Sequence, residues 1–173
     1  MRKIIQSLAV YNAKVDARLV EILRGQPEPT LREDQGAFYK SILGTFEHIL
    51  GADVIWLKRF AGFFSYPSLA ASSLVTADIA ETKARAAKSP AELFALVDQA
   101  DALFVAFAGE LEENQLLSRV KFKNIKGEEL EREYWALVVH VLNHATHHRG
   151  EISALLDRKG VANDYSGFNL YLG

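Results

Sequence analysis

With 173 residues, 49% of them hydrophobic, the chain can bury one core, and we expect a single domain over residues 1–173. A net charge of -2 provides no basic field that would collect a phosphate backbone, which argues against nucleic acid as a partner. The chain has no cysteine, so disulfides and cysteine nucleophiles are excluded, and any metal site must use nitrogen and oxygen ligands.

The start of the chain has the character of a helix rather than of a targeting segment. No apolar run approaches the ~20 residues needed to cross a bilayer. The sequence MRKIIQSLAVYNAKVDARL is amphipathic, because Asn12 and Asp16 interrupt its apolar residues, and no small-residue cleavage site follows. We therefore expect a cytoplasmic protein that does not contact membranes.

Two long helices are predicted in the first part of the chain. Apolar residues at helical spacing predict the first over residues 3–24, and Gly25 followed by QPEP ends it. The second is predicted to begin with Asp34 as its N-cap, because Phe38 and later apolar residues then share one face as far as AGFFSYP. Residues 65–88 carry no pattern that defines an element.

Three further elements are predicted in the second half of the chain. Ser-Pro at 89–90 begins a third helix that continues to about residue 112. Residues 120–133, VKFKNIKGEELERE, predict two short strands around a glycine-containing turn. Helical periodicity then returns over residues 133–159, with Gly160 as the expected stop. Four long amphipathic helices with one longer crossover predict an all-α four-helix bundle, which commonly holds metal ligands on inward-facing positions.

Four of the five histidines lie in HVLNHATHHRG, residues 140–150. Each residue advances about 100° around a helix axis, which places His148 inside the apolar stripe and His144 at its edge. His140 and His147 lie further round, toward solvent or the rim of a pocket. Because two histidines four residues apart lie on one helical turn, His144 and His148 can converge on one ion.

The fifth histidine, His48, lies on the predicted second helix. Its neighbours on the helical wheel are the small residues Ser41, Thr45 and Ala52, which would leave room for a ligand or a solvent cavity. His48, His144 and His148 could supply three nitrogen ligands to a metal ion and leave other positions to water or substrate. The alternative is that these histidines are hydrogen-bonded residues of the core or its rim.

Three segments of the chain resemble the DinB and YfiT-like family of metal-dependent enzymes: YNAKVDARLVEIL, GAFYKSILGTFEHILGADVIWLKRF and VVHVLNHATHHRGEISALL. The last of these is the most specific, and the resemblance covers the chain apart from residues 65–115. It implies a DinB-like four-helix bundle whose three metal ligands match His48, His144 and His148. Because function depends on the site rather than on the fold, the resemblance leaves the reaction open.

Relatives with known reactions include transferases and isomerases that use low-molecular-weight thiols such as bacillithiol or mycothiol. Other members were named for their induction by DNA damage, and many have no known reaction. The chain departs from the family pattern at three positions. Lys14 stands where tryptophan is usual, and Asp16 and Glu151 stand where asparagine and glutamine are common. None of the three is a predicted ligand.

Several polar residues accompany the histidines. Asn12 and Asp16 lie in the middle of an apolar stripe, where they either hydrogen-bond a ligand, a metal-bound water or a substrate, or tie the helix to an arginine or a neighbouring helix. Asp53 lies in the apolar stripe of the second helix, and the same two alternatives apply to it. Glu151 could orient a histidine by accepting its free N–H, or it could be solvated or paired with a cation. The position of Arg149 late in a helix is explained by the helix dipole, or the residue could belong to an anion site.

These observations lead to one main expectation and one alternative. We expect one divalent ion per chain, zinc or nickel first and iron or manganese second, that activates a thiol cofactor or water to act on a small-molecule substrate. Thiol-dependent transfer is favoured over hydrolysis. A carboxylate from Asp16 or Glu151 could instead close the fourth position and give a non-catalytic, stress-related interaction protein. Large aromatic residues around 56–66 also predict a homodimer.

Overall fold

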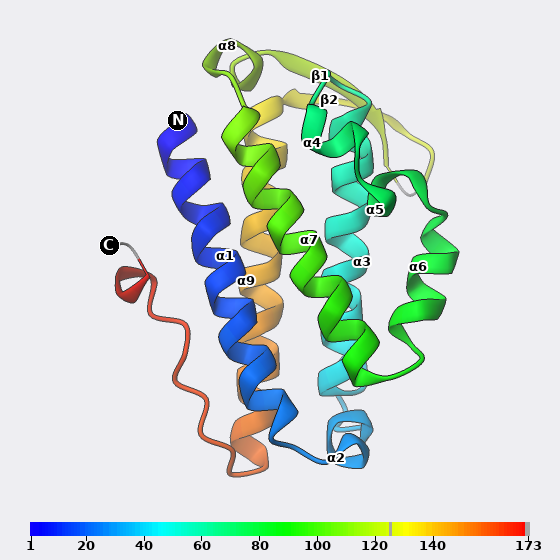
Figure 1. Ribbon diagram of the computed structural model, residues 1–173, viewed down its shortest axis with the longest axis vertical. Coiled ribbons are helices and arrows are strands. Elements are labelled where there is room, and N and C mark those ends of the chain that lie inside the picture. Colours follow the sequence, from blue (N-terminus) through cyan, green and yellow to red (C-terminus); the bar gives the residue numbers. More distant parts are fainter. Residues whose placement is uncertain (125, 172–173) are drawn as a thin grey trace.

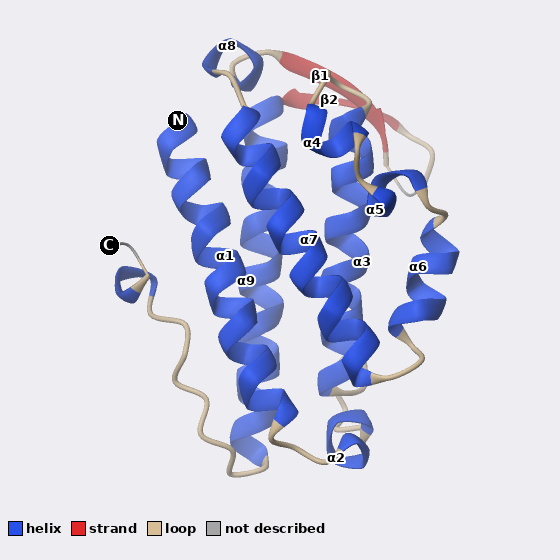
Figure 2. Ribbon diagram, viewed as in Figure 1, coloured by secondary structure: helices blue, strands red, loops and turns tan. Residues whose placement is uncertain are grey.

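The computed structural model describes residues 1–124 and 126–171, and four long helices dominate it (Figures 1 and 2). They are α1 (Arg2–Arg24), α3 (Ile42–Ala61), α7 (Pro90–Glu110) and α9 (Tyr134–Arg158). Helix α1 packs against α7 and α9, and α3 packs against the same two helices. This arrangement confirms the predicted four-helix bundle.

Shorter elements connect the long helices. Their bounds are α2 (Glu28–Arg32), α4 (Pro67–Ala70), α5 (Ser73–Thr76), α6 (Ile79–Ala86), α8 (Glu113–Leu116), β1 (Arg119–Lys123), β2 (Glu129–Glu133) and η1 (Phe168–Leu170). Helices α4, α5 and α6 occupy the crossover between α3 and α7, where the sequence predicted no element. Because this crossover returns along the length of the bundle, α3 and α7 run in the same direction (Figure 1).

The predicted hairpin before the last helix is confirmed. Strands β1 and β2 are antiparallel, with Phe122 opposite Leu130. The turn between them includes Ile125, which lies outside the described residues, and Gly127, whose φ of 81° favours glycine. The Trp56 ring of α3 packs on Phe122, with ring centroids 5.5 Å apart, and so joins the hairpin to the bundle.

The predicted start of the second long helix was wrong. The helix begins at Ile42, and its N-cap is Ser41, whose Oγ accepts a hydrogen bond from the Gly44 backbone N–H at 3.0 Å. Asp34 instead accepts from the backbone N–H of Gly36 at 2.9 Å, which stabilises a turn. Lys40 has a φ of 70°, a left-handed conformation that no α-helix continues through. A loop therefore precedes α3.

The core is rich in aromatic residues that meet between α3 and α7. Phe60 stacks on Phe107 with ring centroids 5.1 Å apart, and Tyr66 meets Phe107 edge-on at 4.9 Å. Phe60 and Tyr66 are almost completely buried. They belong to the aromatic group that motivated the homodimer prediction, and the chain covers them itself. The homodimer stays a prediction, with less support from these residues.

Helix length and hydropathy bear on membrane association. None of the helices in residues 1–124 and 126–171 combines the length and apolar character that crossing a bilayer requires.

Candidate metal centre

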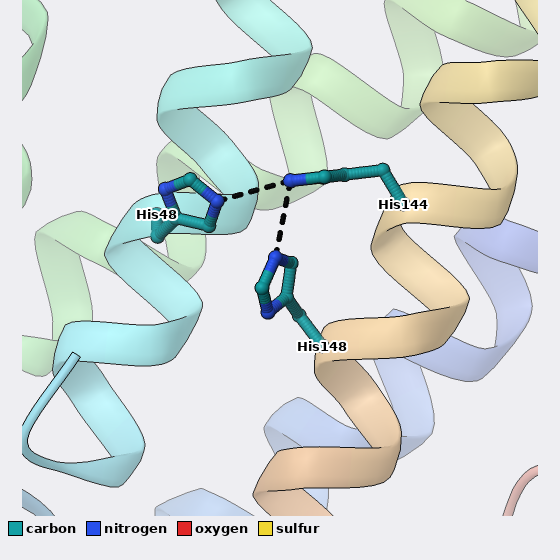
Figure 3. Close-up of side chains that lie close together, drawn as sticks. All are labelled: His48, His144 and His148. Carbon is teal, nitrogen blue, oxygen red and sulfur yellow. Dashed lines mark hydrogen bonds between the residues drawn. The ribbon is translucent and has the colours of Figure 1, made fainter. Parts of the chain in front are cut away.

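Three histidines from two neighbouring helices converge at one point in the bundle (Figure 3). His48 comes from α3, and His144 and His148 come from successive turns of α9. The Nε2 atom of His144 lies 3.0 Å from Nε2 of His48 and 3.1 Å from Nε2 of His148. The structure therefore brings together the three residues that helical geometry selected from the sequence.

The protonation of these imidazoles favours ligand binding. Burial, followed by the charges of the neighbouring histidines, lowers the pKa of His144 to about 4. Burial is also the largest cause that lowers the pKa of His48. Both rings are therefore neutral at pH 7, and a neutral imidazole keeps a lone pair for a metal ion.

The spacing of the three Nε2 atoms fits a single ion. Nitrogen ligands at 2.0–2.1 Å from a tetrahedral zinc ion lie about 3.3 Å from one another. The two separations from His144 are 3.0 and 3.1 Å, and ligand atoms of all three histidines lie within 4.8 Å of one another. Small movements of the rings would accommodate an ion between them.

Glu151 holds His148 in the orientation that this arrangement needs. Its Oε2 atom accepts a hydrogen bond from Nδ1 of His148 at 2.7 Å, so the proton of the ring resides on Nδ1 and the lone pair on Nε2. The other oxygen lies 3.3 Å from Nε2 of His147, on the exposed side of the helix. Glu151 thus contacts the side of the His148 ring opposite the Nε2 cluster, as expected for an orienting residue.

Tyr39 is a part of the site that the sequence did not reveal. Its hydroxyl lies 2.9 Å from Nε2 of His48, and its ring stacks on the His48 ring with centroids 3.9 Å apart. Burial, helped by the charge of Glu151, raises the pKa of Tyr39 above 10, so the hydroxyl is a neutral donor at pH 7. Tyr39 belongs to the loop before α3, where no periodicity marks a residue's direction.

The candidates on α1 form a separate buried network. Asp16 accepts a hydrogen bond from Nη1 of Arg149 at 3.0 Å, and Asn12 donates to Asp16 and to Asp101 at 3.4 and 3.5 Å. The partners of Asn12 and Asp16 are thus an arginine and a carboxylate on neighbouring helices rather than a histidine. This is the tie to a neighbouring helix that the sequence left as one alternative.

This network explains Arg149 and the buried carboxyl groups near it. The helix dipole does not account for Arg149, because its side chain is 2% exposed and pairs with Asp16. Burial, followed by the charge of Asp16, raises the pKa of Asp53 well above its ordinary value of 3.8. Burial likewise raises the pKa of Asp101. The network therefore holds more carboxyl groups than its one arginine can neutralise.

A cavity of about 380 Å³ lies against His48, between α3 and α6. Tyr39 and His48 contribute to its wall, so the cavity reaches the histidine cluster. The small residues of α3 that line it are Gly44 and Gly51 rather than the predicted strip of Ser41, Thr45 and Ala52. Ser41 and Thr45 are instead buried near the start of α3, where Thr45 donates to the Ser41 carbonyl at 2.9 Å.

The fold and the site together define a helix-bundle protein with a three-histidine cluster beside a cavity. The model of the DinB family matches residues 1–170, and the chain belongs to that family. It is similar to Protein DinB of Bacillus subtilis (strain 168), with 24% identity over 162 residues that span 94% of this chain and 90% of the relative. No solved structure matches the chain at a significant level. The family resemblance seen in the sequence is thereby confirmed.

Proposed function

We propose that the protein is a metal-dependent enzyme in which His48, His144 and His148 hold one divalent ion. The observation that carries this proposal is the approach of three imidazole nitrogens beside a cavity, with Nε2 of His144 3.0 and 3.1 Å from the other two. Zinc or nickel is the preferred ion, with iron or manganese as alternatives, because imidazole accepts several transition metals. A bound ion would acidify a water or a thiol, or polarise a carbonyl.

Each surrounding residue has a defined task in such a site. Glu151 fixes the tautomer and direction of His148 by accepting its Nδ1–H. The Tyr39 hydroxyl lies 2.9 Å from Nε2 of His48, and with an ion on that nitrogen it would be free to donate a hydrogen bond to an anionic group at the remaining position. The cavity beside His48 admits a small-molecule substrate. Thiol-dependent group transfer is the first reaction to assay and hydrolysis the second.

The alternative is a non-catalytic metal-binding protein, for which a carboxylate would have to complete the metal site. The contacts of the two candidate carboxylates favour the enzyme. Asp16 is engaged by Arg149, and Glu151 contacts the far side of the His148 ring. Three protein ligands and a place for an exchangeable one are the usual arrangement of a catalytic zinc site.

Metal analysis of the purified protein tests the ligand assignment. We expect about one divalent ion per chain, and far less in the His144→Ala and His148→Ala variants. His147→Ala is the matched control, since this exposed histidine lies on the same helix outside the cluster. Equal metal content in all three variants would exclude the site.

A second experiment separates the enzyme from the binding protein. The visible spectrum of cobalt-loaded protein should change when 2-mercaptoethanol or azide is added, because a small anion can enter an exchangeable position. An unchanged spectrum would indicate a closed site and favour the non-catalytic alternative.

A further inference from the structure

The cavity beside His48 is walled mainly by small and apolar side chains. Helix α3 contributes Gly44, Leu50, Gly51 and Val54, and the crossover contributes Ile79, Ala86 and Ala87. Gly51 adds no side chain to the α3 wall, whereas a Cβ atom on Gly44 would meet the Tyr39 carbonyl. The volume of about 380 Å³ lies at the lower end of the range for small-molecule sites, which is roughly 300–1,000 Å³.

Two charged residues, Glu47 and Lys83, also line the cavity, and only the glutamate has an ion-pair partner within the described residues. Glu47 is held by Arg32, with Oε1 of the glutamate 3.5 Å from Nη1 of the arginine. The side chain of Lys83, on α6, forms no ion pair or hydrogen bond within residues 1–124 and 126–171. The ammonium group of Lys83 is therefore the charge available to a ligand.

The Lys83 side chain lies in the wall of the cavity, close to Gly51 of α3. A Cβ atom placed on Gly51 would lie 3.5 Å from Cε of Lys83, so the lysine side chain extends over this glycine. Gly51 is one helical turn beyond His48 on α3. Lys83 and His48 both line this cavity.

We propose that this cavity binds a small organic acid, whose apolar body contacts the α3 and α6 walls and whose carboxylate pairs with Lys83. Burying hydrocarbon in the cavity supplies affinity, and the lysine selects for negative charge. Binding of such an acid follows from the cavity alone. Its assignment as the substrate class of the enzyme rests on the proposed function.

The test compares three probes of the same length: hexanoate, hexan-1-ol and hexylamine. Their dissociation constants are measured by titration calorimetry on protein treated with a chelator, so that no carboxylate can bind a metal ion. We expect hexanoate to bind about fivefold more tightly than hexan-1-ol, the upper range for an exposed ion pair, and hexylamine to bind most weakly. Equal affinity for hexanoate and hexan-1-ol would overturn the proposal.

Lys83→Met keeps an unbranched side chain, one atom shorter, and removes the charge. It should abolish the preference for hexanoate and leave the affinity for hexan-1-ol unchanged. Lys88→Met, a change at an exposed lysine outside the cavity, should behave as the wild type. If both variants retain the preference, Lys83 is not the recognition residue and the proposal fails.

Amide chemical shifts then locate the bound probe. Hexanoate should shift the ¹H–¹⁵N signals of Gly44 and Gly51, which line the cavity, and leave that of Gly62 at the end of α3 unchanged. The opposite pattern would place the probe elsewhere and refute the proposal. Because these measurements use metal-free protein, they can succeed even if the metal analysis excludes the proposed function, and they can fail while that analysis succeeds.

Discussion

Arg149 of α9 and Asp16 of α1 form an ion pair inside the bundle, with Nη1 of the arginine 3.0 Å from Oδ2 of the aspartate. The two side chains are 2% and 1% exposed. The arginine also donates to Thr146 Oγ1 at 3.0 Å, while Oδ1 of Asp16 is buried without a partner in the described residues. The pair joins α1 to α9, and Arg149 directly follows His148 in the sequence.

Removing one member of this pair should strongly destabilise the fold. Arg149→Leu leaves Asp16 as an uncompensated buried charge, and we expect a loss of about 3–5 kcal/mol in the free energy of unfolding. The double variant Arg149→Leu/Asp16→Leu should recover much of that loss, since no charge is then stranded. Urea denaturation at pH 7 measures both.

A surface pair on α1 provides the control for this experiment. Arg18 and Glu21 form an ion pair with exposed side chains, and Glu21→Gln should cost less than about 1 kcal/mol. If Arg149→Leu cost no more than Glu21→Gln, the buried pair would not contribute as described.

Asp53 should make stability depend on pH. Its pKa in the folded protein is raised well above 3.8, chiefly by burial and then by the charge of Asp16, so the folded state binds this proton more tightly than the unfolded state. Stability is therefore lost as pH rises from about 4 through the raised pKa. Asp53→Asn should lose less stability than the wild type between pH 5 and pH 8, by on the order of 1 kcal/mol.

Denaturation curves at several pH values measure this difference. Asp164→Asn, at an exposed position after α9, serves as the control and should follow the wild type. Parallel pH profiles for the wild type and Asp53→Asn would contradict the prediction.

Glu151→Gln should weaken metal binding. A glutamine still accepts the Nδ1–H of His148 but lacks the negative charge that raises the basicity of this ligand, and mutation of such partners typically costs 10–100-fold in metal affinity. Competition with a chromophoric chelator gives the dissociation constant. Asp157→Asn, at an exposed acid further along α9, should leave the affinity unchanged. A normal affinity in Glu151→Gln would mean that Glu151 does not support the site.

The start of α3 can be tested by two substitutions. Ser41→Ala removes the side chain that accepts the Gly44 N–H, and we expect a loss of about 1 kcal/mol in the free energy of unfolding. Asp34→Ala affects only an exposed turn and should cost less than Ser41→Ala. Thermal denaturation distinguishes the two, and the reverse order would contradict the assignment of Ser41 as the N-cap.

Periodicity was sufficient to predict most of the fold and the histidine cluster. The angular positions of His144 and His148 follow from their spacing on α9, because a regular helix fixes the direction of each side chain. Tyr39 could not be found in this way, since the direction of a loop residue is set by tertiary contacts. Asp34 misled the prediction because aspartate caps both helices and turns, and only the backbone conformation at Lys40 distinguishes them.

Buried charges were harder to interpret than apolar stripes. The position of Asp16 among apolar residues indicated that it needs a partner, but not which one. Arg149 is 133 positions away along the chain, and its pairing depends on how α1 and α9 come together. The cavity could not be predicted either, because its outer wall is α6, which lies in a segment whose sequence shows no helical or strand periodicity.

The histidine cluster and the outer wall of the cavity are built from different parts of the chain. The three histidines belong to α3 and α9, two long helices whose mutual packing fixes the nitrogen separations. The outer wall of the cavity belongs to α6, a short helix of the crossover. Mutations in α6 can therefore reshape the cavity during evolution without moving the histidines. Descendants of one ancestral bundle could keep an identical histidine cluster while their preferences for small molecules diverge.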